Sequence, residues 1–343
     1  MTSFERSMWC RMASCGRLLI GLAIRSRISR PTRVWAAMLL LAGAGFAQQR
    51  NPGVHVLPVQ GNVYMIVGPG GNMTMQAGKE GVLLVDTMSA GVSDQVLAAI
   101  RTVSDKPIRY IINTHMHADH TGGNEKLAKA GSTIAGGNVV GDIGASASAG
   151  ATVIAAQQVL DRMSEKGGPP SGAWPTDTYI TDSKELFFNG EAIQIFHQPA
   201  AHTDGDSLVF FRRSDVLSTG DIFVTTSYPV IDTDRGGTYR GVLDGLNHIL
   251  DITIPADKQE GGTYVIPGHG RLSDEADVVE YRDMITILRK RFVDMIQRGM
   301  TLEQVKAAKP TRDYDGLYGN PDKFVEAAYK TLASPKASAP GRR

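Results

Sequence analysis

The sequence predicts a layered α/β protein, and three observations lead to that class. Short runs of β-branched and other apolar residues, separated by glycine-rich turns, recur in two groups along the chain. Segments with apolar residues at helical spacing separate these groups and follow the second one. With 343 residues, of which 42% are hydrophobic, the chain can bury a sizeable core as one large domain or two smaller ones.

Residues 1–47 differ in composition from the rest and predict a secretory signal peptide. They hold seven arginines and one acid, Glu5, and then pass into an apolar run at 34–46 that closes on small residues. That run of 13 residues is short, because a transmembrane helix needs about 20. We expect cleavage after Ala47 and a secreted or periplasmic protein without stable membrane insertion; a short membrane anchor is the alternative.

Loss of this leader changes the charge of the chain. The whole chain carries a formal net charge of +1, and residues 1–47 contribute +6, which leaves −5 for the remainder. This acidic balance disfavours a nucleic-acid partner. Both cysteines, Cys10 and Cys15, lie in the leader, so the exported protein has neither a disulfide nor a thiolate ligand. Nothing in the sequence indicates an oligomeric state.

The first half of the body is predicted as a sheet with helices. Three short runs indicate strands of an antiparallel sheet: 54–57, 63–67 and 82–85. Residues 93–103 have helical spacing with Ser93 as the N-cap, and 108–113 form a further strand. The Gly-, Ala- and Ser-rich segment 131–151 is expected to be a mobile insertion, followed by a helix at 151–163.

The second half is predicted as another sheet and a helical end. Four short runs between turn residues indicate its strands: 185–188, 192–196, 207–211 and 216–217. Apolar residues from Val278 to Ile296 form a helical stripe that stops near Gly299. Thr301 and Gln304 fit a capping box that opens another helix.

Four metal-capable side chains fall within six residues directly after the strand at 108–113. They are His115, His117, Asp119 and His120. The chain holds only 8 His, so chance explains such a cluster poorly. Active sites of layered α/β proteins commonly lie at the carboxyl ends of strands. The cluster therefore predicts a metal site.

Three further candidates, His202, Asp221 and His269, also lie near strand ends. Glycine precedes Asp221 and flanks His269, which lets the backbone turn sharply toward a shared centre. Zinc with nitrogen and oxygen ligands favours four-coordination at about 2.0–2.2 Å, so seven candidates exceed the need of one ion. The count predicts two ions with a shared ligand.

The order of these residues, His115-x-His117-x-Asp119-His120 followed by His202, Asp221 and His269, resembles the metallo-β-lactamase superfamily. The resemblance runs from about residue 54 to the helices after His269. It implies a four-layer αββα sandwich, with the domain at 48–335 and a flexible tail at 336–343. By the same resemblance, His115, His117 and His202 hold the first metal, Asp119, His120 and His269 the second, and Asp221 bridges both.

This site implies hydrolysis of a small molecule. Two zinc ions are expected, with iron or manganese as alternatives that the ligands also admit. A metal-bridging hydroxide would attack the carbonyl of an ester, lactone, thioester or amide. Asp119 is the expected catalytic residue, orienting the hydroxide and protonating the leaving group. Asp86 is expected to accept a hydrogen bond from a ligand histidine and fix its tautomer.

Three alternative functions stay open. Dedicated β-lactamases of the superfamily usually carry Cys or Ser where this chain has Asp221, yet export suits β-lactam hydrolysis. A mononuclear iron enzyme similar to persulfide dioxygenases would use the same motif. A non-catalytic periplasmic metal-binding accessory protein would keep the site without turnover.

Substrate-contacting residues are harder to predict. The loop 228–232 and the turn 68–72 are candidates for the pocket wall, and Tyr228 could equally pack under its loop. The remaining histidines His55, His197 and His248 match no position of the motif and are left out of the site.

Overall fold

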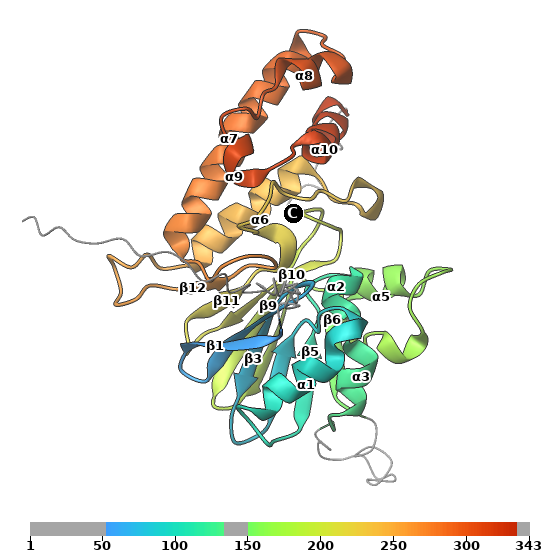
Figure 1. The fold of residues 1–343 in the computed structure, drawn as a ribbon, viewed down its shortest axis with the longest axis vertical. Helices are drawn as coiled ribbons and strands as arrows, with labels where there is room; N and C mark the ends of the chain where they lie inside the picture. The colour runs from blue at the N-terminus through green and yellow to red at the C-terminus, as the bar shows by residue number, and fades with distance from the viewer. Residues whose placement is uncertain (1–52, 134–149, 335–343) are drawn as a thin grey trace, which may run out of the picture. The chain divides into compact units, whose positions relative to one another are not determined.

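The computed structural model describes residues 53–133 and 150–334, which form two β-sheets packed face to face with helices on both outer faces (Figure 1). This confirms the predicted αββα layers. The predicted leader 1–47, the tail 336–343 and most of the insertion 131–151 lie outside the described residues. Within those ranges, no helix combines the length and apolar character needed to span a membrane.

The first sheet has seven strands in sequence order, from β1 to β7. They are β1 His55–Gln60, β2 Val63–Gly68, β3 Gly71–Ala77, β4 Val82–Val85, β5 Ile108–Ile112, β6 Thr152–Ala156 and β7 Asp177–Tyr179. Strands β1 to β4 pair antiparallel, as predicted, whereas β4 to β7 pair parallel. Strand β3 was not predicted, because its methionines are not a strand signature.

The second sheet has five strands in the order β12-β11-β10-β9-β8. They are β8 Ser183–Phe188, β9 Glu191–Gln198, β10 Asp206–Phe211, β11 Val216–Ser218 and β12 Tyr264–Ile266. Only β11 and β12 pair parallel. The four strands predicted from the sequence are confirmed, and β12 completes the sheet by pairing with β11 from a distant part of the chain.

The described helices mostly cover the outer faces. They are α1 Ser93–Arg101, α2 Ala118–Thr121, α3 Asn124–Lys129, α5 Gln157–Met163, α6 Tyr239–Ile252, α7 Glu275–Gln297, α8 Leu302–Ala308, α9 Asp315–Tyr318 and α10 Asp322–Ala333. The predicted helical stripe is α7, which ends before Gly299. The predicted capping box of Thr301 and Gln304 opens α8.

Two local predictions were wrong. Residues 151–163 were expected to be one helix, but their first half is strand β6, which pairs parallel with β5 and is buried. A strand buried on both faces shows no alternation, so its apolar run resembles a helix segment. Ser93 is not the N-cap of α1: Val92 takes that position, and the Ser93 hydroxyl donates to Ala90 O in the preceding turn.

Three layers of apolar contact hold the sandwich together. Between the sheets, side chains such as Leu83, Ile154 and Ile195 are fully or almost fully buried. Helices α1 and α3 pack Val96, Ile100 and Leu127 against the outer face of the first sheet. Helices α6, α7 and α10 form the largest cluster, on the outer face of the second sheet.

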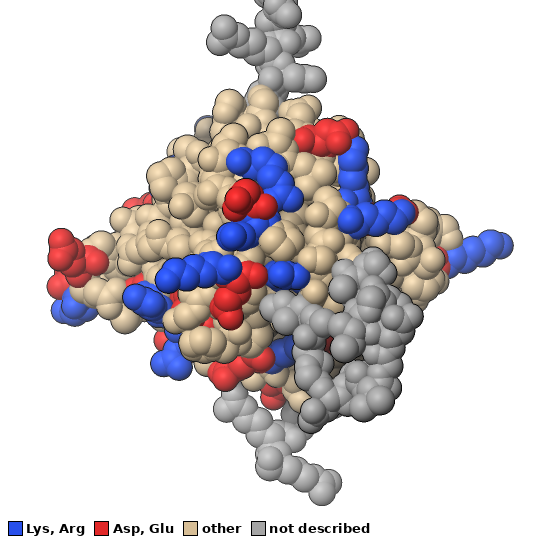
Figure 2. All heavy atoms as spheres, turned by 90° about the horizontal axis from the view of Figure 1, so that it is seen from below, with Lys and Arg blue, Asp and Glu red and all other residues tan. Residues whose placement is uncertain are grey.

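Several loops meet at one edge of this sandwich. Residues after β4, β5, β11 and β12, together with the β9–β10 connection, all leave or enter the sheets there. The face in Figure 2 shows basic and acidic side chains interspersed, with no broad area of one sign on its described part. At the loop edge, by contrast, the strand order brings side chains from both sheets together.

Helix α6 starts against the segment that precedes His202, and Gly241→Ala should reveal how tight that contact is. A Cβ on Gly241 would lie 1.8 Å from Ala200 O. Alanine favours a helix by about 1 kcal/mol over glycine, but overpacking of this kind costs about 1–3 kcal/mol or more. We expect net destabilisation in urea unfolding.

Gly316→Ala is the matched control, because Gly316 lies in α9 with nothing near its Cβ direction. That variant should be as stable as the parent or slightly more so. Equal stability of the two variants would show that the α6 contact is loose.

Candidate metal centre

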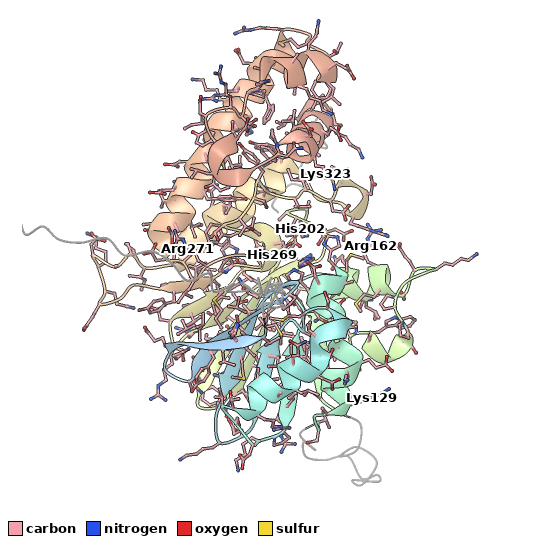
Figure 3. All side chains as sticks on the ribbon, viewed as in Figure 1. Lys129, Arg162, His202, His269, Arg271 and Lys323 are labelled. Atoms are coloured by element: carbon pink, nitrogen blue, oxygen red, sulfur yellow. The ribbon has the colours of Figure 1, made fainter. Side chains whose placement is uncertain are left out.

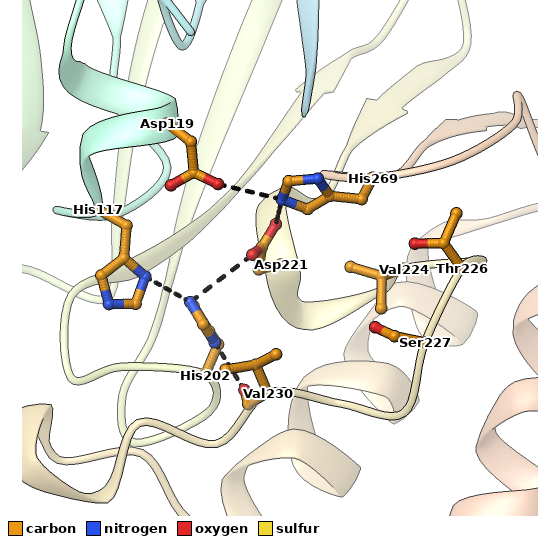
Figure 4. A pocket seen from close by; sticks show the side chains of 9 residues that line it. All are labelled: His117, Asp119, His202, Asp221, Val224, Thr226, Ser227, Val230 and His269. Atoms are coloured by element: carbon orange, nitrogen blue, oxygen red, sulfur yellow. Dashed lines mark hydrogen bonds and ion pairs between the residues drawn. The ribbon is translucent and has the colours of Figure 1, made fainter. Parts of the chain in front are cut away.

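The seven side chains singled out in the sequence come together at the loop edge. Their ligand atoms form three groups whose members lie within 4.8 Å of one another: His115, His117 and His202; His115, His120 and Asp221; Asp119, His120 and His269. His202 and His269 lie where the strands end and the helices begin, far from Lys129 (Figure 3). Several of the set face one shared space (Figure 4).

One carboxylate, Asp86, sets the tautomers of two histidines. His120 Nδ1 donates to Asp86 Oδ2 at 2.8 Å. The Thr114 hydroxyl donates to the same oxygen at 2.7 Å, so its own oxygen accepts from His115 Nδ1 at 3.1 Å. Both imidazoles therefore turn an Nε2 lone pair inward. The hydrogen bond expected of Asp86 is present.

Val230 and Asp232, on the loop after β11, fix the tautomers of His202 and His117. His202 Nδ1 donates to Val230 O at 2.6 Å, and His117 Nε2 donates to Asp232 Oδ2 at 2.9 Å. His202 thus directs Nε2 inward and His117 directs Nδ1 inward. These two nitrogens lie 2.9 Å apart. With both protons donated outward, the facing lone pairs need a cation between them.

The buried atoms of the centre test whether a metal fits. His115 Nε2, His120 Nε2 and Asp221 Oδ1 have no hydrogen-bond partner among the described residues. Asp221 Oδ1 lies 3.3 Å from His120 Nε2 and 3.3 Å from His269 Nε2, and its Oδ2 lies 3.8 Å from His202 Nε2. Tetrahedral bonds of about 2.0–2.1 Å hold ligand atoms about 3.3–3.4 Å apart. These donor atoms fit divalent cations. Asp221 lies between two triads of possible ligands, which are His115, His117 and His202, and Asp119, His120 and His269.

The pKa values of the clustered histidines and carboxylates indicate that the centre is stabilised by added positive charge. Burial, with His120 and His202 nearby, lowers the pKa of His115 well below its usual range. Burial opposes charge on Asp221 as well, but the neighbouring His120, with His269 and His115, holds the pKa of Asp221 well below its usual range. The nearby carboxylates of Asp119 and Asp221 raise the pKa of His269 to about 9. Without an ion, histidine protons supply the charge that a metal would bring.

A cavity of about 340 Å³ opens beside the ligands (Figure 4). Its other walls are Val224, Thr226, Ser227 and Val230, from the segment after β11. Of these, only Val230 lies in the loop predicted to line a pocket. The other three wall residues could have been predicted only from their position shortly after Asp221 in the sequence. Among the described residues, no Lys, Arg or Glu lines the cavity.

Tyr228 packs beneath its loop rather than lining the cavity. It is 3% exposed and lies parallel to Phe324, with ring centroids 5.2 Å apart. Its hydroxyl donates to Asp315 Oδ1 at 2.8 Å. Tyr228 therefore fastens the cavity wall to the C-terminal helices.

The histidines left out of the prediction lie outside the centre. His197 Nε2 is bonded to Asp204 O at 2.9 Å, and His248 Nδ1 to the amide of Gln198 at 2.6 Å. His55 opens strand β1 and is exposed. None belongs to a potential ligand group in the described part of the chain.

A family model described as the metallo-beta-lactamase superfamily matches residues 56–269, more than half of the chain. The chain belongs to the metallo-beta-lactamase superfamily. The expected family is thereby confirmed, and the His and Asp cluster is that of a metal-dependent hydrolase of this superfamily.

Individual relatives include alkylsulfatases. The chain is 27% identical to a linear primary-alkylsulfatase of Pseudomonas sp. (strain ATCC 19151) over 258 residues, 66% of this chain and 47% of that protein. It spans about half the length of the curated relatives it matches.

Solved structures share the fold. An inverting sec-alkylsulfatase from Pseudomonas sp. gives a TM-score of 0.59 at 16% identity, covering 81% of this chain and 50% of that one. A metallo-beta-lactamase from Pontibacter korlensis gives 0.52 at 16% identity, covering 68% and 99%. At such identities the likeness concerns the fold alone.

Asp232 fixes the tautomer of His117, and Asp232→Asn should reverse it. Asp232 Oδ1 accepts from the backbone N–H groups of Asp234 and Arg235 at 3.2 and 3.1 Å, so an amide oxygen would stay there. The amide nitrogen would then donate to His117 Nε2, and the imidazole proton would move to Nδ1. We expect about 10–100-fold weaker affinity for one of two ions, measured by competition with a chromophoric chelator.

Asp234→Asn, on the same turn, is the control. Its side chain is 87% exposed and pairs with Lys330 at 3.2 Å, away from the ligands. This variant should bind metal like the parent. Unchanged affinity for both ions in Asp232→Asn would contradict the tautomer argument.

Proposed function

We propose that this chain is an exported dinuclear zinc hydrolase that cleaves an ester, lactone, thioester or amide bond in a small molecule. One observation carries the proposal: histidine and carboxylate lone pairs converge on a buried space in which three polar atoms lack hydrogen-bond partners among the described residues. Nitrogen and oxygen ligands without a thiolate suit zinc, and the set exceeds the need of one four-coordinate ion. Export rests on the basic and apolar leader.

When bound, two divalent cations would lower the pKa of a water between them and polarise the reacting carbonyl. In this proposal His115, His117 and His202 hold the first ion, and Asp119, His120 and His269 hold the second. Asp221, whose two oxygens reach toward both triads, is the shared ligand. Outward hydrogen bonds keep the first-triad imidazoles and His120 oriented before an ion arrives.

Asp119 is the expected proton carrier. Its side chain is 37% exposed and lines the cavity, with Oδ2 3.4 Å from His269 Nε2. Burial raises its pKa, but the neighbouring His269 and His120, with a backbone hydrogen bond, together outweigh burial and lower the pKa overall. The ionised carboxylate can therefore take a proton from the attacking water and deliver it to the leaving group.

The cavity wall favours an uncharged substrate portion. Beyond the ligands it offers two valines and two hydroxyl residues, and no basic side chain among the described residues. Val230 is 55% exposed at this wall, an apolar surface that an acyl or alkyl group could cover. These features support a neutral carbonyl compound.

Sulfate-ester hydrolysis is the second candidate. The sequence similarity to a linear primary-alkylsulfatase and the structural similarity to a sec-alkylsulfatase favour it. The same centre could polarise a sulfate oxygen, and the apolar wall would suit an alkyl chain. The lack of a basic residue at the described cavity wall argues for the carbonyl substrate first.

Metal content should distinguish this proposal from the iron alternative. We expect about two zinc ions per chain in protein purified without added metal, and one or fewer in Asp221→Ala, by elemental mass spectrometry. Activity of the variant should fall at least about 100-fold. Asp94→Ala, which removes an exposed carboxylate paired with Lys126, should change neither value.

One iron per chain, little changed by Asp221→Ala, would overturn the dinuclear zinc proposal and favour oxygen-dependent chemistry. The same preparations should be assayed with aryl esters, lactones, thioesters, β-lactams and alkyl sulfates. Preference for the first three would support the carbonyl proposal, and preference for alkyl sulfates the second candidate. A fully loaded chain inactive on all of them would favour an accessory role.

A further inference from the structure

Asn72, near the start of β3, binds the loop that carries His269. Its side-chain amide donates to Pro267 O at 2.9 Å and to Gly270 O at 3.0 Å, and its backbone N–H donates to Gly268 O at 2.8 Å. The residue is 5% exposed. Both amide hydrogens are thus used on one short loop from the other sheet, on either side of His269.

His269 is held differently from the other histidines of the centre. Those four each place the outward ring nitrogen against an oxygen: His115, His117, His120 and His202. Within the described residues, His269 has no such partner, and the charged groups near its ring nitrogen are the carboxylates of Asp119 and Asp221. The direction of its ring therefore depends on the backbone of its loop.

The glycines on both sides of His269 leave its backbone fewer steric restrictions than other residues would. Gly268 and Gly270 flank the histidine, and Gly270 has a φ of +108°. A Cβ on Gly268 would lie 2.0 Å from Asp221 Oδ1, so glycine is required for the close approach. The neighbouring Gly71 also lies close, since its Cβ would stand 3.1 Å from His269 Cε1. The segment after β11 also holds this loop, since Gly268 N–H donates to Gly220 O at 2.9 Å and Thr225 N–H donates to His269 O at 3.0 Å. The contacts of Asn72 add three hydrogen bonds from the first sheet and so restrict the loop further.

We propose that Asn72 is a positioning residue for the second metal triad, acting on His269 through the backbone of residues 267–270. The inference rests on the proposed dinuclear site. Asn72 contacts none of the ligand side chains; it orders the loop before an ion binds, so less entropy is lost on binding. The first triad is held by Thr114, Val230 and Asp232 instead and does not share these contacts.

The test compares metal binding by the full chain and its Asn72 variants. Asn72→Ala removes the donors, and Asn72→Asp keeps the shape but points acceptors at two carbonyl oxygens. Metal-depleted proteins are titrated with Co²⁺, and the absorption of the two sites is followed. We expect about 10–100-fold weaker binding of one ion in both variants, with the other unchanged. Thr74→Val is the control on the same strand, since its buried hydroxyl has no partner among the described residues.

A double-mutant cycle with His269→Ala separates positioning from general stability. If Asn72 acts through His269, then Asn72→Ala adds no further loss of cobalt affinity in the His269→Ala background. Thermal unfolding of each apoprotein checks that the variants fold. If Asn72→Ala does not fold, the isosteric Asn72→Asp provides the comparison.

Three results would overturn the inference, and only the last of them would also overturn the dinuclear proposal. Two ions bound as tightly by the Asn72 variants as by the parent, or equal weakening at both sites, would refute the role of Asn72 while leaving the dinuclear proposal intact. A parent chain that takes up only one ion would overturn both.

Discussion

Inward-facing lone pairs are the constraint on which the rest of this structure depends. His117 Nδ1 and His202 Nε2 approach to 2.9 Å although their protons are directed elsewhere, and Asp221 adds a carboxylate to the same buried space. Such a cluster is unfavourable until a positive charge enters it. The surrounding fold therefore has to hold these groups in an arrangement that they would not adopt alone.

The fold meets this demand with contacts from several loops. Asp86 adopts a positive φ of 65°, and its two oxygens together bind Thr114 and His120. Val230 and Asp232 hold His202 and His117 from a loop that Tyr228 fastens to the C-terminal helices. Because strands β5, β11 and β12 end at the same edge, short connections are enough to bring these residues together. The C-terminal helices α6 to α10 thus support the centre without contributing a ligand to it.

Much of the centre could be predicted because its signal is local. Four of the candidates lie within six residues of sequence: His115, His117, Asp119 and His120. The order of the remaining candidates completes a family pattern. Strand β6 could not be distinguished from a helix, since burial on both faces removes alternation. The roles of Asn72 and of the Val230 carbonyl could not be predicted for another reason. Their hydrogen-bond partners lie far away in the sequence, and a backbone acceptor can belong to any residue type. Sequence thus indicates ligands more readily than it indicates what orients them.

The position of both cysteines in the proposed leader has a consequence for the rest of the protein. Residues 48–343 contain no cysteine, so an exported form has no covalent cross-link between distant segments. The centre joins positions from His115 to His269 across both sheets. Ions bound there would close chain loops much as disulfides do in exported proteins, and binding free energy would become folding free energy. Metal supply would then govern how long the proposed exported form stays folded as well as what it catalyses.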